Sequence, residues 1–79
     1  YATSDSFFCI QETNLAMMAD LGTLQRLPHL IPEGVARELA YTGDKLTAER
    51  AKNLGLVNEI FDSHEQLLEH VLKIAHRIA

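Results

Sequence analysis

The chain has 79 residues, a formal net charge of −4 and one cysteine, Cys9. A single cysteine excludes an internal disulfide, and the scattered lysines and arginines form no basic stripe for nucleic acid or a membrane anchor. The apolar runs are too short to span a membrane, and the first residues lack the features of a secretory signal. We therefore expect one domain over 1–79 in a reducing, intracellular compartment, with no nucleic-acid or membrane partner. The chain reads like a segment from the middle of a longer protein.

The first elements are a strand and a short helix. Phe7 to Gln11 has the apolar, aromatic composition of a short buried strand, in which the thiol of Cys9 is expected to be buried and inert. Asp20 can cap the N-terminus of a helix that ends at Leu27, because Pro28 follows.

The next helix is predicted from Pro32 and Glu33, which suit a first turn, to a stop near Gly43. Its apolar positions form one stripe, consisting of Val35, Ala36, Leu39 and Ala40.

A third helix begins after Thr47, a good N-cap residue, and ends at Gly55. Residues 56–61 alternate between apolar and polar, as a brief strand or extended link does. Ser63 and Gln66 have capping-box spacing and open the last helix. The apolar stripe of that helix consists of Leu67, Leu68, Val71, Leu72, Ala75 and Ile78.

The predicted fold class is mostly α with one or two short strands. The chain has few aromatic residues and no tryptophan, so its helices carry more apolar surface than they can cover among themselves. We expect a homo-oligomer that associates through the last helix and the helix after Pro32. A non-catalytic helical interaction module is an alternative interpretation of the same stripes.

Several kinds of site can be set aside. The histidines have no ligand spacing and are expected to be solvated surface imidazoles: His29, His64, His70 and His76. The glycines stand singly near helix ends, so no phosphate-binding loop is present, and no nucleophile elbow is found.

Two carboxylates remain, Glu12 and Asp20, eight positions apart in an apolar segment. Glu12 could simply face solvent at a strand end, and Asp20 could act only as a helix cap. Alternatively, both reach one apolar pocket, where burial would raise their pKa values and suit proton transfer at carbon. The apolar residues around it are Leu15, Met17, Met18 and Leu21. The two methionines could equally be core filler.

The sequence resembles the C-terminal region of the crotonase (enoyl-CoA hydratase/isomerase) superfamily. The matching motifs are F-x-x-x-E at Phe8 to Glu12, Gly-Thr-x-Gln-Arg-Leu at 22–27, Thr42-Gly43, and A-x-x-A-x-x-x-GLV at 48–57. The resemblance implies that 1–79 is a C-terminal fragment of a crotonase-like domain, the C-terminal portion of the α/β crotonase spiral fold. Ala16 departs from the pattern, which usually has glycine there.

By this resemblance, Glu12 matches a hydratase acid/base residue. An aspartate eight positions later, Asp20, resembles the Δ3,5-Δ2,4-dienoyl-CoA isomerases of fatty-acid metabolism. The expected activity is a 1,5-proton shift, with Glu12 near C2, Asp20 near C6 and either carboxylate as the starting base. An enoyl-CoA hydratase is the alternative.

Acyl-CoA is then the substrate, and no cofactor or metal is expected. The family forms its oxyanion hole upstream of this region, so residues 1–79 alone should be inactive. The expected compartment is the bacterial cytoplasm, or the mitochondrion or peroxisome in a eukaryote.

Overall fold

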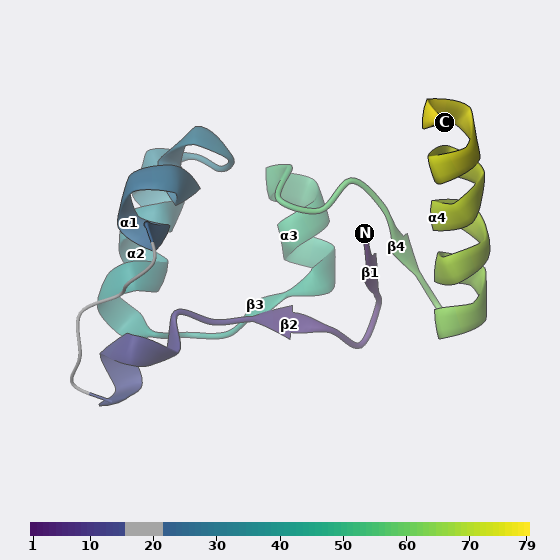
Figure 1. Ribbon diagram of the computed structural model, residues 1–79. Coiled ribbons are helices and arrows are strands. Elements are labelled where there is room, and N and C mark those ends of the chain that lie inside the picture. Colours follow the sequence, from purple (N-terminus) through teal and green to yellow (C-terminus); the bar gives the residue numbers. More distant parts are fainter. Residues whose placement is uncertain (16–21) are drawn as a thin grey trace.

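The computed structural model describes residues 1–15 and 22–79 (Figure 1). In chain order the elements are β1 (Ala2–Thr3), β2 (Phe7–Phe8), the 3₁₀ helix η1 (Gln11–Leu15), α1 (Thr23–Arg26), the 3₁₀ helix η2 (Leu27–His29), α2 (Glu33–Thr42), β3 (Leu46–Thr47), α3 (Ala48–Leu54), β4 (Ile60–Phe61) and α4 (His64–Ile78). The described part is thus rich in helix, as the sequence predicts, but it has four strands of two residues each where the sequence predicts one or two.

The strands form two separate pairs. β1 pairs in parallel with β4, with Ala2 opposite Ile60, and β2 pairs antiparallel with β3, with Phe7 opposite Thr47. Both pairs join segments that are far apart in the sequence, as Figure 1 shows for β2 and β3. The N-terminal segment is therefore fixed at two points, one beside α3 and one beside α4.

The first strand predicted from the sequence corresponds to β2 and differs from its prediction. The sequence predicts a buried strand over residues 7–11, but β2 is only Phe7–Phe8 and both side chains are exposed. β2 has one neighbouring strand, and the Nζ of Lys45 lies 4.6 Å from the centre of the exposed Phe7 ring. Apolar composition thus predicted extended structure correctly, but burial was wrong because it depends on a covering layer.

α1 is shorter than predicted at its start. It begins at Thr23 after Gly22, whose φ of 81° is left-handed and whose carbonyl accepts the N–H of Arg26 at 2.9 Å. Asp20, the predicted cap, lies outside the described residues. The predicted stop before Pro28 is confirmed, because the α-helix ends at Arg26 and the chain continues as η2.

α2 and α3 match the sequence prediction closely. α2 ends at Gly43, which has a φ of 66°, and α3 ends at Gly55, which has a φ of 91°. At the start of α3, the hydroxyl of Thr47 accepts the N–H of Arg50 at 3.2 Å. After Gly55, the N–H of Leu56 donates to the carbonyl of Ala51 at 2.9 Å, so the GLV motif closes the helix end.

The core is centred on β3 and the helices on either side of it. Leu46 in β3 is only 1% exposed, and Ala48 and Ala51 of α3 are fully buried. The other members come from β1, α2 and the connecting segments: Ala2, Ile10, Ile31, Ala36, Leu39 and Val57. The predicted stripe of α2 is present and faces this core, so it is covered within the chain instead of being left for the oligomer contact expected of this helix.

α4 is the longest helix of the described part, but it buries none of its residues fully. Ser63 caps it as predicted, since its hydroxyl accepts the N–H of Gln66 at 3.2 Å. On its apolar stripe Leu68 is 46% exposed, Leu72 50% and Ile78 82%. Figure 1 shows α4 at one edge of the molecule, beyond β4.

His70 on α4 corrects one prediction. It is half-buried rather than solvated, because its ring lies 5.0 Å from that of Phe61 and 5.2 Å from that of Tyr1, measured between centroids. These ring contacts attach α4 to the pair of strands β1 and β4. No helix among the described residues has the length and apolar character needed to cross a membrane.

Candidate active site

Glu12 lies in η1, the five-residue 3₁₀ helix that follows the buried Ile10, and is half-buried. η1 packs against α2. The chain therefore turns at Gln11 instead of continuing as a strand, so Glu12 sits on a turn and not at a strand end.

The side chain of Asn14 ties η1 to the end of α2. Its amide nitrogen donates to the carbonyl oxygen of Gly43 at 3.0 Å and to Oε1 of Gln11 at 3.2 Å. One contact spans 29 residues of sequence and the other closes the turn around Glu12. The amide thereby links the carboxylate-bearing turn to the core helix α2.

Gly43 is the residue that makes this close contact possible. A Cβ at this position would lie 2.5 Å from Oδ1 of Asn14, and the positive φ already disfavours other residues. Beside it, the hydroxyl of Thr42 donates to the carbonyl of Glu38 at 2.8 Å and accepts the N–H of Asp44 at 3.2 Å. The Thr42-Gly43 motif therefore ends α2 and also forms the surface that receives η1.

Cys9 belongs to the same polar cluster, and the prediction that its thiol is buried is wrong. The residue is half-buried, and its sulfur lies 3.1 Å from the Gly43 carbonyl oxygen and 3.3 Å from Oε1 of Gln11. The amide of Asn14 also reaches the sulfur, at 3.7 Å. Sequence reasoning missed this cluster, although Asn14 two positions after Glu12 was a possible signal.

Asp20, the second candidate carboxylate, lies outside the described residues, as do Met17 and Met18. Leu15, at the end of η1, is described and is 61% exposed. The pairing of Glu12 with Asp20 in one apolar pocket therefore stays a prediction.

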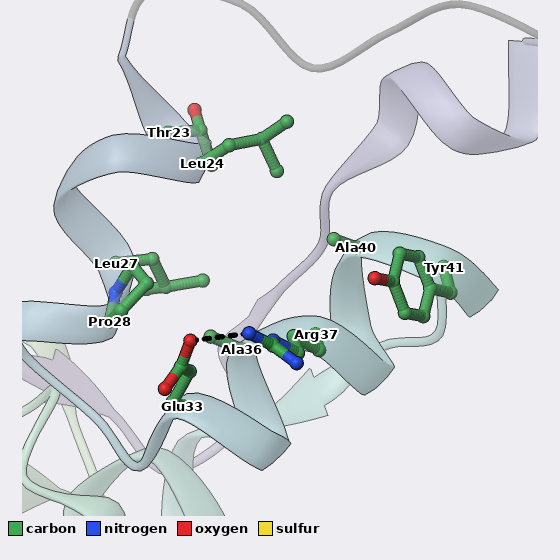
Figure 2. Close-up of a pocket in the computed structure, with 9 residues that line it drawn as sticks. All are labelled: Thr23, Leu24, Leu27, Pro28, Glu33, Ala36, Arg37, Ala40 and Tyr41. Atoms are coloured by element: carbon green, nitrogen blue, oxygen red, sulfur yellow. Dashed lines mark hydrogen bonds and ion pairs between the residues drawn. The ribbon is translucent and has the colours of Figure 1, made fainter.

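A pocket of about 280 Å³ lies between α2 and the segment formed by α1 and η2 (Figure 2). Its lining is mainly apolar and consists of Thr23, Leu24, Leu27, Pro28, Glu33, Ala36, Arg37, Ala40 and Tyr41. Figure 2 shows the carboxylate of Glu33 joined to the guanidinium of Arg37, and their ion pair is 2.7 Å long. Glu12, on η1, is not among these lining residues, so the described residues do not bring the pocket and this carboxylate together as one site.

A shifted pKa lies elsewhere among the described residues, between α3 and β4. The pKa of Glu59 is lowered because its carboxylate accepts a hydrogen bond from the Lys52 ammonium and another from the N–H of Ile60. The ion pair with Lys52 is 2.7 Å long. It joins the end of α3 to the strand that leads into α4, which is a structural role. In the described ranges, no three histidine, cysteine or acidic side chains are grouped as a metal site.

Comparison with known proteins identifies the family. The profile of enoyl-CoA hydratase/isomerase matches residues 1–79. The chain belongs to this family. It is 46% identical to the mitochondrial Delta(3,5)-Delta(2,4)-dienoyl-CoA isomerase of Dictyostelium discoideum over 98% of the chain and 26% of that protein. It is also 42% identical to the crotonyl-CoA hydratase of Syntrophomonas wolfei over 98% of the chain and 29% of that protein.

A solved structure agrees with the fold. The enoyl-CoA hydratase of Mycobacterium tuberculosis H37Rv superposes with a TM-score of 0.87 and 44% identity, over 98% of this chain and 30% of that one. The family resemblance and the fold class predicted from the sequence are thereby confirmed. The chain spans about a quarter of the length of the curated relatives it matches.

Proposed function

We propose that this chain is part of an enzyme that acts on acyl-CoA thioesters, and that the enzyme is a Δ3,5-Δ2,4-dienoyl-CoA isomerase. The observation that carries the proposal is the acid pair Glu12 and Asp20. It is supported by the similarity to a dienoyl-CoA isomerase, which extends over 98% of this chain. Acyl-CoA is the substrate. No electrons are exchanged in the reaction, so it calls for no redox cofactor.

The reaction moves one proton along a conjugated chain. A base removes a proton from C2, which is acidic because it lies beside the thioester carbonyl, and an acid delivers a proton to C6. The double bonds shift from positions 3 and 5 to positions 2 and 4, so atoms and charge balance. Glu12 acts at C2 and Asp20 at C6, each as a positioned acid/base group.

The trienolate formed after C2 deprotonation carries negative charge on the thioester oxygen. Stabilising that charge is usually a large part of catalysis, and backbone N–H donors supply it in oxyanion holes. By resemblance to the family, these donors come from a region upstream of the one that residues 1–79 represent. The 79-residue chain alone should therefore show no turnover on acyl-CoA substrates, and turnover above a blank would contradict this.

The test uses the full-length enzyme that carries this region. We expect it to convert a 3,5-dienoyl-CoA to the 2,4-isomer. The reaction is followed by the ultraviolet absorbance of the product, whose diene is conjugated with the thioester carbonyl. Glu12→Gln and Asp20→Asn should each lower the rate by roughly 10²-fold or more, the usual scale for a positioned acid or base. Rates near wild type in both variants would mean that neither carboxylate is catalytic, and that Glu12 only faces solvent and Asp20 only caps a helix.

Enoyl-CoA hydration is the second candidate, favoured by the crotonyl-CoA hydratase among the relatives. In that reaction Glu12 would still transfer a proton near C2, whereas Asp20 would be dispensable. An Asp20→Asn variant that keeps full activity, together with water addition to a 2-enoyl-CoA, would favour the hydratase.

Assembly and location complete the proposal. The exposed apolar stripe of α4 suits contact with a further copy of the chain, so we propose a homo-oligomer. The compartment is the cytoplasm of a bacterium, or the mitochondrion or peroxisome of a eukaryote.

A further inference from the structure

The position of η1 needs an anchor outside the helix itself. A 3₁₀ helix of five residues has few internal hydrogen bonds, and their geometry is poorer than in an α-helix. It therefore does not fix its own orientation. η1 also ends in Leu15, whose side chain is mostly exposed and gives little packing there. The direction of Glu12 must therefore depend on contacts that η1 makes with the rest of the fold.

The amide of Asn14 supplies such contacts. It reaches the Gly43 carbonyl at 3.0 Å, Oε1 of Gln11 at 3.2 Å and the sulfur of Cys9 at 3.7 Å. One acceptor lies before η1, one at its first residue and one at the end of α2. A single side chain thus holds the beginning of the turn against a helix whose stripe is buried in the core.

The geometry of a 3₁₀ helix couples Asn14 to Glu12. With about three residues per turn, side chains two positions apart leave the helix about 120° apart around its axis. When Asn14 faces Gly43, Glu12 is turned to a different side of η1. Rotation of η1 about its axis would break the Asn14 contacts and redirect the carboxylate at the same time.

We propose that Asn14 is a positioning residue, whose amide locks η1 onto the left-handed Gly43 end of α2 and so aims the Glu12 carboxylate at the substrate. This inference rests on the proposed catalytic role of Glu12. Gly43 takes part because a Cβ there would lie 2.5 Å from Oδ1 of Asn14 and would displace its side chain.

The test compares variants of the full-length enzyme in the dienoyl-CoA assay. Asn14→Ala and the similarly sized Asn14→Leu should each lower kcat by about 10- to 100-fold, because small misplacement of a reacting group has effects of that size. KM should change little, because neither variant removes a contact that binds the substrate equally in the ground state and the transition state. Asn53→Ala, in an exposed position of α3, is the matched control and should keep wild-type kinetics.

Gly43→Ala gives an independent measurement. It should lower kcat in the same way, and the double variant Asn14→Ala with Gly43→Ala should be no slower than Gly43→Ala alone, because the two changes break one contact. If the reductions in kcat of the two single variants multiply in the double variant, the two residues act separately, and the proposal is overturned.

Further outcomes separate this proposal from the proposed function. If Glu12→Gln is inactive while Asn14→Leu keeps the wild-type kcat, the positioning role is wrong and the catalytic role of Glu12 stands. If Glu12→Gln keeps full activity, the proposed function itself fails. Thermal melting of each variant is measured in parallel, and unfolding of both Asn14 variants at the assay temperature would assign the amide to stability instead and overturn the proposal.

Discussion

α3 and α4 have the same kind of beginning but different surroundings. Thr47 caps α3 and Ser63 caps α4, each by accepting a backbone N–H three residues later at 3.2 Å. Yet α3 contains two fully buried alanines, whereas α4 has no buried residue at all. The comparison teaches that local chemistry determines where a helix begins, while burial depends on what the rest of the protein places against it.

The largest difference between the two regions should appear on truncation of apolar side chains in the 79-residue chain. Leu46→Ala, in β3 immediately before α3, should lower the free energy of unfolding by about 2–5 kcal/mol, because it removes a buried side chain and leaves a cavity. Leu72→Ala on α4 should change it within about 0.5 kcal/mol at protein concentrations where the chain is monomeric. Urea denaturation followed by circular dichroism measures both, and equal losses would mean that α4 is buried after all.

Association should be the next largest effect, and it concerns α4 specifically. We expect the 79-residue chain to self-associate, because each apolar side chain withdrawn from water contributes about 1.5–3 kcal/mol. Sedimentation equilibrium over a hundredfold dilution should show dissociation, and Leu68→Glu or Leu72→Glu should abolish association. Arg50→Glu, in an exposed position of α3, is the control for added charge. A compact monomer with concentration-independent melting would contradict this prediction.

The caps should have similar effects in the two regions. Thr47→Ala and Ser63→Ala should each lower stability by about 1 kcal/mol, because each leaves a backbone N–H without its acceptor. Thr47→Ser and Ser63→Thr retain a hydroxyl and should stay close to wild type. Hydrogen exchange of the amides in the first turns of α3 and α4 locates the loss. A much larger loss at Thr47 than at Ser63 would mean that the core, rather than the cap, sets the stability of the α3 end.

The smallest effect concerns the ion pair that joins the two regions. The pKa of Glu59 is lowered in the folded chain, chiefly by the hydrogen bond from Lys52, so ionised Glu59 favours folding. Its contribution is present above the ordinary value of 4.5 and is lost as the pH falls through the lower folded value. Glu59→Gln should remove this part of the acid dependence of unfolding, measured by denaturation at a series of pH values. An unchanged acid dependence would show that the exposed pair is fully screened.

Most helix bounds could be predicted because their signals are local. Gly43 and Gly55 adopt the left-handed conformation that ends α2 and α3. The hydroxyls of Thr47 and Ser63 cap the starts of α3 and α4, each by accepting an N–H three residues later. The stripe of α2 was also predicted correctly, since a 3.6-residue period reflects one buried face.

The rest depends on contacts that no local pattern contains. The Phe7 to Gln11 run was predicted as one buried strand, but only Phe7 and Phe8 pair with β3, and the chain then turns into η1. The anchor of that turn joins Asn14 to Gly43, 29 positions away. His70 was predicted as a surface residue because its ring partners, Tyr1 and Phe61, belong to distant parts of the sequence. Glu12 could be named as a candidate, but the support around it could not.

The exchange of substrate protons in heavy water tests the acid pair most directly. The full-length enzyme is incubated with a 3,5-dienoyl-CoA in D₂O, and deuterium at C2 and C6 is located by NMR. The wild-type enzyme should form a product with deuterium at C6. Asp20→Asn should still exchange the C2 protons of the substrate while forming little product, and Glu12→Gln should do neither. Exchange at C2 by Glu12→Gln at the wild-type rate would contradict the assignment of Glu12 as the base at C2.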